Sequence, residues 1–241
     1  MRKEFILLAI VFVSSLFASP SHAVVTQTSF QAEVWVDNWF ALYINGKKVG
    51  EDAIAYNTEK SFNSSIIKFN ATYPFEVGIL ARDYMENSSG LEYIGKPNQQ
   101  IGDAGLIVQI REVKSGKIVG TTNSDWKSFV VQKAPLNPTC VHSVQPLNEC
   151  KSTLSKIPTA WSTLPFNDSK WKFSFVFTES EVGVKDGYFD FSWSAASKLI
   201  WSEDLKLDNT VLFRSRVTGK NVTSTGTSNE FLLTSPDRSE E

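Results

Sequence analysis

The chain has 241 residues, of which 41% are hydrophobic and 12% aromatic, and its formal net charge is −2. Because acidic and basic residues are nearly balanced and no long run of like charge occurs, the composition argues against a nucleic-acid partner and against binding to an anionic membrane surface. The length suits one large β domain, and aromatics within most strand-like segments favour a packed fold over disorder.

The first 23 residues have the three parts of a secretory signal peptide. A basic pair follows the initiator methionine, an apolar run covers positions 5–17, and small residues stand three and one positions before a cut after Ala23. A membrane anchor is the alternative, but a spanning helix needs ~20 apolar residues and this run is shorter. We predict a signal peptide over 1–23, a secreted mature chain and no membrane span.

Hydrophobic residues then alternate with a period of two, the pattern of half-buried strands. The first two runs cover 30–36 and 40–44, and the Asn45-Gly46 pair that follows tolerates the positive φ angles of a two-residue type I′ turn. A β-hairpin is therefore predicted here. Further strand-like runs follow in chain order: 75–81, 106–110, 118–122, 126–131, 171–177, 198–201 and 210–217.

No segment of helical length keeps a period of 3.6, and only residues 178–186 could hold one helical turn. About ten short strands separated by Gly, Asn, Asp, Pro and Ser clusters describe an antiparallel sandwich. We predict an all-β, jelly-roll β-sandwich over 24–220, with Trp201 in its core and a polar C-terminal tail over 221–241.

Two cysteines, Cys140 and Cys150, lie in a proline-rich stretch over 135–166. An oxidising compartment favours a disulfide between them, and the chain-entropy argument gives so short a ring about 2–3 kcal/mol of stabilisation. A thiol nucleophile or a metal pair is the alternative, but a structural zinc site wants four ligands and only His142 is near. The stretch is predicted to be a stapled loop over one end of the sandwich.

The stretch DNWFALYINGKKVGED at 37–52 resembles the hairpin of galactose-binding-like jelly-roll domains, which occur in glycoside hydrolases and secreted proteins. The stretches EVGILARD, GDAGLIVQI and AASKLIWSEDLKLDNTVLFRSRV resemble later strands of that family, so the similarity covers nearly the whole mature chain. The resemblance implies a sandwich whose loops often bind carbohydrate, sometimes with a structural calcium. It does not identify a ligand, and the cysteine loop departs from the family pattern.

Trp39 stands out in the hairpin because it is opposite in phase to the apolar Phe40 face. A tryptophan beside a polar turn could stack on a sugar ring, with polar neighbours binding the hydroxyls. We predict Asp37, Trp39, Arg82 and Tyr84 as the ligand-binding residues. The structural alternatives are a packed Trp39, a bend-forming Asp37 and an Arg82 paired with a nearby acid.

Several acidic turns could supply oxygen ligands to calcium, and Asp103 in IGDAG is the most plausible ligand of a structural calcium ion. No other cofactor is predicted. The mature chain has one histidine and no Gly-x-Ser-x-Gly stretch, which argues against a nucleophilic hydrolase. A pair of carboxylates could still hydrolyse a glycoside, although sequence cannot show the pairing.

These features predict a secreted, non-catalytic module that binds carbohydrate or a glycoconjugate. The alternatives are an extracellular structural or adhesive protein that binds another protein, and an accessory protein of a glycoside hydrolase. Acceptor motifs for N-glycosylation are predicted surface positions that carry sugar only in a eukaryotic host: Asn63, Asn70, Asn87, Asn167 and Asn221.

Overall fold

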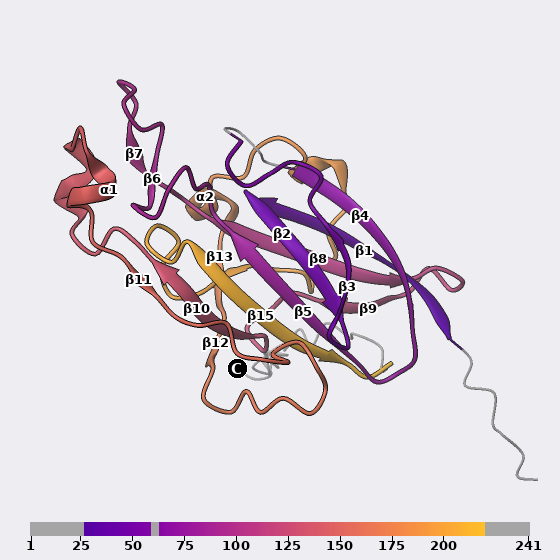
Figure 1. Ribbon diagram of the computed structural model, residues 1–241. Coiled ribbons are helices and arrows are strands. Elements are labelled where there is room, and N and C mark those ends of the chain that lie inside the picture. The colour runs from indigo at the N-terminus through magenta and orange to yellow at the C-terminus, as the bar shows by residue number, and fades with distance from the viewer. Residues whose placement is uncertain (1–26, 59–62, 220–241) are drawn as a thin grey trace, which may run out of the picture.

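Two antiparallel β-sheets stacked face to face form the body of the molecule, as the computed structural model shows for residues 27–58 and 63–219 (Figure 1). The six-stranded sheet has the order β13 (Phe175–Phe177), β14 (Leu199–Trp201), β8 (Gly105–Glu112), β1 (Thr28–Asp37) and β4 (Asn63–Ala71), with β9 (Ile118–Thr121) paired to β8. Every pairing in it is antiparallel, which agrees with the predicted sandwich.

The second sheet has seven strands. Its order is β11 (Thr153–Leu154), β10 (Lys127–Lys133), β15 (Thr210–Val217), β5 (Phe75–Arg82), β2 (Trp39–Ile44) and β3 (Lys47–Glu51), with β12 (Lys172–Phe173) also paired to β10. A small pair, β6 (Leu91–Glu92) and β7 (Gln100–Ile101), stands beside the sandwich. The helical segments are short: η1 (Pro138–His142), α1 (Pro146–Glu149), α2 (Glu179–Val182) and η2 (Tyr188–Asp190).

The predicted hairpin is the β2–β3 pair. Asn45 and Gly46 both have positive φ, 49° and 85°, as a type I′ turn requires. The Asn45 side-chain oxygen accepts a hydrogen bond from the backbone N–H of Glu76 at 2.8 Å, which ties the turn to the neighbouring strand. Because side chains alternate along β2, Phe40 and Leu42 point to the same face, and both are completely buried between the sheets.

The core lies between the two sheets and is built from the alternating side chains of both. Strands β1 and β8 are buried on their outer side as well, because Trp35 and Ile107 pack there against Val182 of α2 and Tyr188 of η2. Ile107 is therefore buried although it lies on the outer side of the sheet. Trp201 is completely buried, as predicted.

The long loop after β10 packs against two different parts of the molecule. Its first part, with both cysteines, packs beside β6 and β7, where the cysteines contact Leu91 (Figure 1). Its second part covers the outer face of the seven-stranded sheet, where Trp161 and Trp171 pack on Leu80 and Leu212. The sequence predicted the disulfide-linked loop at one end of the sandwich, but it did not predict that the loop also covers the outer face of the seven-stranded sheet.

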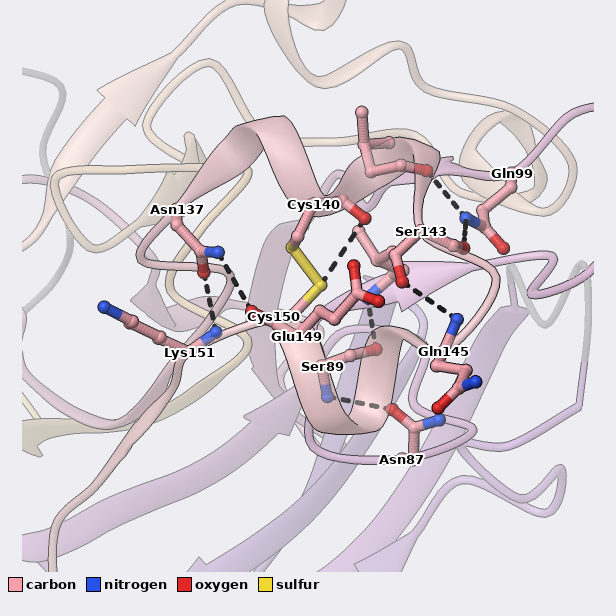
Figure 2. The surroundings of a disulfide bond; sticks show 12 residues. Asn87, Ser89, Gln99, Asn137, Cys140, Ser143, Gln145, Glu149, Cys150 and Lys151 are labelled. Carbon is pink, nitrogen blue, oxygen red and sulfur yellow. Dashed lines mark hydrogen bonds between the residues drawn. A yellow bond between two sulfur atoms is a disulfide. The ribbon is translucent and has the colours of Figure 1, made fainter.

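The disulfide between Cys140 and Cys150 links η1 to the residue that ends α1 (Figure 2). Replacing both cysteines by alanine is expected to lower the free energy of unfolding by about 2–3 kcal/mol, because the 10-residue separation no longer restricts the unfolded chain. Chemical denaturation of the oxidised protein and of the double variant measures the difference. An unchanged midpoint and slope would show that the loop is held by packing alone.

Some predictions concern residues that lie outside the described ranges: the signal peptide over 1–23, the tail over 221–241 with Asn221, and the side chain of Asn63. Of the remaining acceptor asparagines, Asn70 and Asn167 are exposed and Asn87 is partly buried. Within the described ranges, none of the helices has the length and apolar character needed to cross a bilayer.

Candidate functional site

Four carboxyl groups meet where several strands end, and we call Asp37, Asp83, Glu92 and Asp103 the acidic cluster. Asp37 is the last residue of β1 and pairs with Gly105, the first residue of β8, so Asp103 lies just ahead of that strand. Asp83 directly follows β5, and Glu92 lies in β6. The antiparallel order therefore brings four distant segments to one end of the sandwich (Figure 1).

Three of the four carboxyl groups of the cluster are buried, and Asp103 is partly exposed. Asp37 and Asp83 are each 1% exposed, and Glu92 is 6% exposed. Among the described residues, neither carboxylate oxygen of Asp37 accepts a hydrogen bond from a donor. The carboxyl group of Asp103 is close enough to form a hydrogen bond with Asp37. Two carboxyl groups can form such a bond only when one of them carries a proton.

These surroundings disfavour negative charge. Burial raises the pKa of Asp37 well above its usual range, and the charges of Asp103 and Glu92 raise it further, whereas Lys185 lowers it. Burial likewise raises the pKa of Asp83 well above its usual range, with smaller contributions from Glu92, Asp37 and Asp103. Burial also raises the pKa of Glu92, although a hydrogen bond from Gln100 opposes the shift.

Polar groups and a glycine fix the positions of these carboxyls. The backbone N–H of Tyr84 donates to Asp83 at 2.7 Å, and the side-chain amide of Asn209 lies 3.4 Å from the second Asp83 oxygen. The amide oxygen of Asn209 is itself buried and accepts no hydrogen bond from any described residue. A larger residue at Gly102 would displace the Asp83 carboxylate, because a Cβ at that position would overlap it.

Two of the predicted ligand contacts are enclosed. Asp37 belongs to the acidic cluster, and Tyr84, which is 5% exposed, stacks on Tyr93 with ring centres 6.3 Å apart. Neither side chain faces solvent in this conformation. Asp103, the predicted calcium ligand, lies in the same cluster as Asp37.

The other two predicted contacts, Trp39 and Arg82, form a stack with Tyr56. The Arg82 guanidinium lies 4.6 Å from the Tyr56 ring centre and 5.6 Å from the Trp39 ring centre. The side chains of Trp39 and Arg82 are partly exposed. The neighbouring acid Asp83 does not pair with Arg82, because its side chain is buried in the acidic cluster. Trp39 also packs against the aromatic cluster under the long loop, as one structural alternative had predicted.

A groove of about 370 Å³ opens beside β10, and we call it the β10 groove. Strand β12 pairs with the edge of β10 at Lys127 and Ser128, and β11 pairs with the same edge at Gln132 and Lys133, so the groove lies along the edge between them. Three aromatic rings, several hydroxyl groups and charged groups of both signs line it: Ser128, Phe129, Val130, Lys133, Thr153, Lys170, Trp171, Lys172, Phe173, Ser202, Glu203 and Asp208.

Hydrogen bonds hold the walls of the β10 groove in place. Asp208 accepts from Ser202 Oγ at 2.7 Å and pairs with Lys133 at 3.1 Å. Lys172 pairs with Glu203 at 2.7 Å across the opening. Phe173 remains 56% exposed, with the Lys127 ammonium 3.4 Å from its ring centre.

Sequence reasoning did not single out this groove. Its aromatic residues were assigned to strands, and strand alternation does not tell which aromatic side chain stays exposed. The alternation gave no signal here, because it assigns Phe173 to the buried face and Ser174 to the exposed face, whereas the structure exposes Phe173 and buries Ser174.

No family model, curated protein or solved structure matches the chain. The function is therefore inferred from the acidic cluster and the β10 groove. Within the described ranges, no group of three or more His, Cys, Asp or Glu side chains is arranged to hold a metal ion. A cation at the acidic cluster would need additional oxygens from amides, backbone carbonyls or water.

Proposed function

We propose that the protein is a secreted, non-catalytic module of the galactose-binding-like kind that recognises carbohydrate or a glycoconjugate in the β10 groove. The observation that carries the proposal is the combination of an exposed aromatic ring, Phe173, with ordered polar side chains in one groove. An extracellular location is supported by the disulfide and by the N-terminal sequence pattern.

The chemistry of the β10 groove suits a sugar. An aromatic face matches the C–H side of a pyranose ring, and hydroxyl, ammonium and carboxylate groups exchange hydrogen bonds with sugar hydroxyls. Ser128, Thr153 and Ser202 supply hydroxyl groups along the groove, and Lys133 and Glu203 supply charge. Because charges of both signs line the walls, a neutral or mixed-charge glycan fits better than a strongly anionic one.

Burial of the acidic cluster favours binding over catalysis. A glycosidase sets two carboxyl groups on either side of the scissile bond, so both must be reachable by substrate. Asp37 and Asp83 are each 1% exposed and leave no opening for a sugar between them. Steady turnover of chromogenic glycosides that is lost on Asp83→Asn substitution would contradict a purely binding role.

Replacing Phe173 by alanine is expected to weaken glycan binding about tenfold, because the stacking surface is lost while the groove's polar groups remain. A glycan array with the purified mature protein identifies the ligand, and titration calorimetry with that glycan measures both proteins. Phe189→Ala is the matched control, since Phe189 is 76% exposed on η2 and does not line the groove. Equal affinity of wild type and Phe173→Ala would reject the groove as the sugar site.

A role in protein adhesion is the second candidate, and it is favoured by the edge of the six-stranded sheet. Strand β13 is an edge strand, and Phe175 and Val176 on it are 46% and 45% exposed. An exposed apolar edge can pair with a strand of another chain. A protein that binds no glycan on the array, but whose capture of an extracellular partner is lost on Val176→Lys substitution, would favour this role.

A further inference from the structure

Two edge strands border a groove on the side of the sandwich away from β10. Strand β3 ends the seven-stranded sheet and β4 ends the six-stranded sheet, whereas β10 lies near the other end of the seven-stranded sheet (Figure 1). Ile67 of β4 packs on Gly50 of β3, and beyond this contact the strands border a groove of about 510 Å³, which we call the β3–β4 groove. Its lining residues are Gln27, Ile44, Asn45, Lys47, Lys48, Val49, Lys68, Phe69, Asn70, Ala71 and Thr72.

The charge of the β3–β4 groove is positive. Lys47, Lys48 and Lys68 are exposed, and among the described residues no aspartate or glutamate lines the groove. Lys48 pairs with Glu51 at 3.0 Å, but Lys47 and Lys68 form no ion pair within the described part of the chain. Because cationic groups along a concave surface raise the local concentration of anions, the groove favours a negatively charged ligand.

Two side-chain amides add hydrogen-bond donors to the same groove. The Asn45 oxygen accepts from the backbone N–H of Glu76 at 2.8 Å, which fixes the orientation of this amide. The Asn70 oxygen accepts from the hydroxyl group of Ser29 at 2.7 Å. Because both amide oxygens already accept a hydrogen bond, the amides present their N–H donors to a ligand.

A second groove adjoins the first along β4. It measures about 370 Å³, and Lys68, Phe69 and Asn70 line both grooves. Its lining includes no acidic residue from the part of the chain that the structure describes. Both volumes lie in the range of pockets that bind small organic ligands, so the surface accommodates a ligand of several linked units rather than one small ion.

We infer that the β3–β4 groove binds an acidic oligosaccharide, whose sugar units carry carboxylate or sulfate groups. Lys47 and Lys68 pair with the anionic groups, and the Asn45 amide donates to a neighbouring sugar or anion oxygen. This site goes beyond the proposed function and is independent of it, because no described residue lines both the β10 groove and the β3–β4 groove.

The same features disfavour other anionic partners. An extended peptide would pair with the free edge of β3 or β4, and lysines on edge strands oppose such pairing. A membrane surface is flat, whereas these lysines border a hollow. A nucleic acid calls for a long basic stripe, which the nearly balanced charge of the chain does not supply.

The test is titration calorimetry of the mature protein secreted from a bacterial host, in which Asn70 carries no glycan. A galacturonic acid hexasaccharide presents carboxylates and a heparin-derived hexasaccharide presents sulfates, so the two probes distinguish the two kinds of anion. At least one of them is expected to bind at about 50 mM salt and to bind severalfold more weakly at about 0.5 M salt, because salt screens exposed charges. Lys47→Ala combined with Lys68→Ala should weaken binding about tenfold.

Lys47→Arg combined with Lys68→Arg keeps both charges and should bind as wild type. Lys156→Ala combined with Lys206→Ala is the matched control, since both lysines are exposed and line neither groove. Failure of both probes to bind, or equal losses in the two alanine double variants, would overturn the inference, and tighter binding of a hexaglutamate peptide would assign the groove to a peptide instead. Phe173→Ala should keep full affinity for the acidic probe, so failure of this site and failure of the β10 groove are distinguishable.

Discussion

Replacing Arg214 by methionine is expected to lower the free energy of unfolding by about 3–5 kcal/mol, because it leaves a buried acid without its partner. Arg214 is 2% exposed, and its guanidinium binds Glu76 and Asp168, each at 2.9 Å. It also donates to the backbone carbonyls of Trp161 and Thr163 in the covering loop. One side chain therefore joins β15 to β5 and to the loop across the sheet face.

The size of this loss should depend on pH. Burial raises the pKa of Glu76 from 4.5 to about 7 even though Arg214 and Arg216 lower it. Between about pH 4.5 and pH 7, the Glu76 carboxyl is protonated in the native state but ionised in the unfolded state. Glu76 therefore lowers the free energy of unfolding as the pH rises through this range. Without Arg214 the native pKa of Glu76 rises further, and the difference between variant and wild type should widen above pH 7.

Chemical denaturation at pH 5 and pH 8 measures both effects. Combining Arg214→Met with Glu76→Gln should recover part of the loss and remove the widening, because no buried charge is left to ionise. Arg216→Met is the control, since Arg216 is 53% exposed and lies 3.8 Å from Glu76. A loss in Arg214→Met that is identical at both pH values would show that lost packing, rather than an unpaired Glu76, dominates.

The strands were the most predictable part of the molecule, because period-two alternation reports a face that is buried between sheets. Phe40 and Leu42 lie in the core, and the positive φ angles at Asn45 and Gly46 follow from residue types that tolerate them. The one helical turn predicted near residue 180 is α2, which begins with a capping box formed by Thr178 and Glu181.

The segment over 171–177 shows where alternation fails. It resembles one strand, but its first half pairs with β10 in one sheet as β12, and its second half pairs with β14 in the other sheet as β13. Each half is an edge strand of its sheet. Phe173 and Phe175 are both exposed, whereas Ser174 between them is buried. Pairing partners distant in sequence, not the local pattern, decide which side chains are covered.

The acidic cluster was only partly predictable for the same reason. Asp37 and Asp103 stood out as polar residues at predicted turns, but Asp37 was assigned to ligand contact rather than to a buried group. Nothing in the local sequence marks Asp83 or Glu92 as buried, because the residues that contact them come from other segments: Asn209 lies against Asp83, and Gln100 donates to Glu92. A network among side chains from four segments becomes visible only once the sheet order is known.

Replacing Trp201 by alanine is expected to lower the free energy of unfolding by about 3–5 kcal/mol through the cavity left between the sheets. The Trp201 side chain is completely buried and its ring centre lies 5.4 Å from that of Phe213. Its indole N–H also donates to the backbone carbonyl of Asp208 at 2.9 Å, and Asp208 lines the β10 groove. The same residue therefore fills the core and fixes one wall of the proposed sugar site.

Trp201→Phe separates these two contributions. Phenylalanine refills most of the cavity but cannot donate to the Asp208 carbonyl, so a smaller loss of about 1–3 kcal/mol is expected. Denaturant unfolding of wild type and both variants gives the stabilities, and titration with the glycan identified on the array gives the affinities. If the indole hydrogen bond orders the groove, Trp201→Phe should weaken glycan binding while the protein stays folded. A Trp201→Phe variant that binds as wild type would show that the remaining partners of Asp208 are enough to hold it: Ser202, Lys133 and the Asp204 carbonyl.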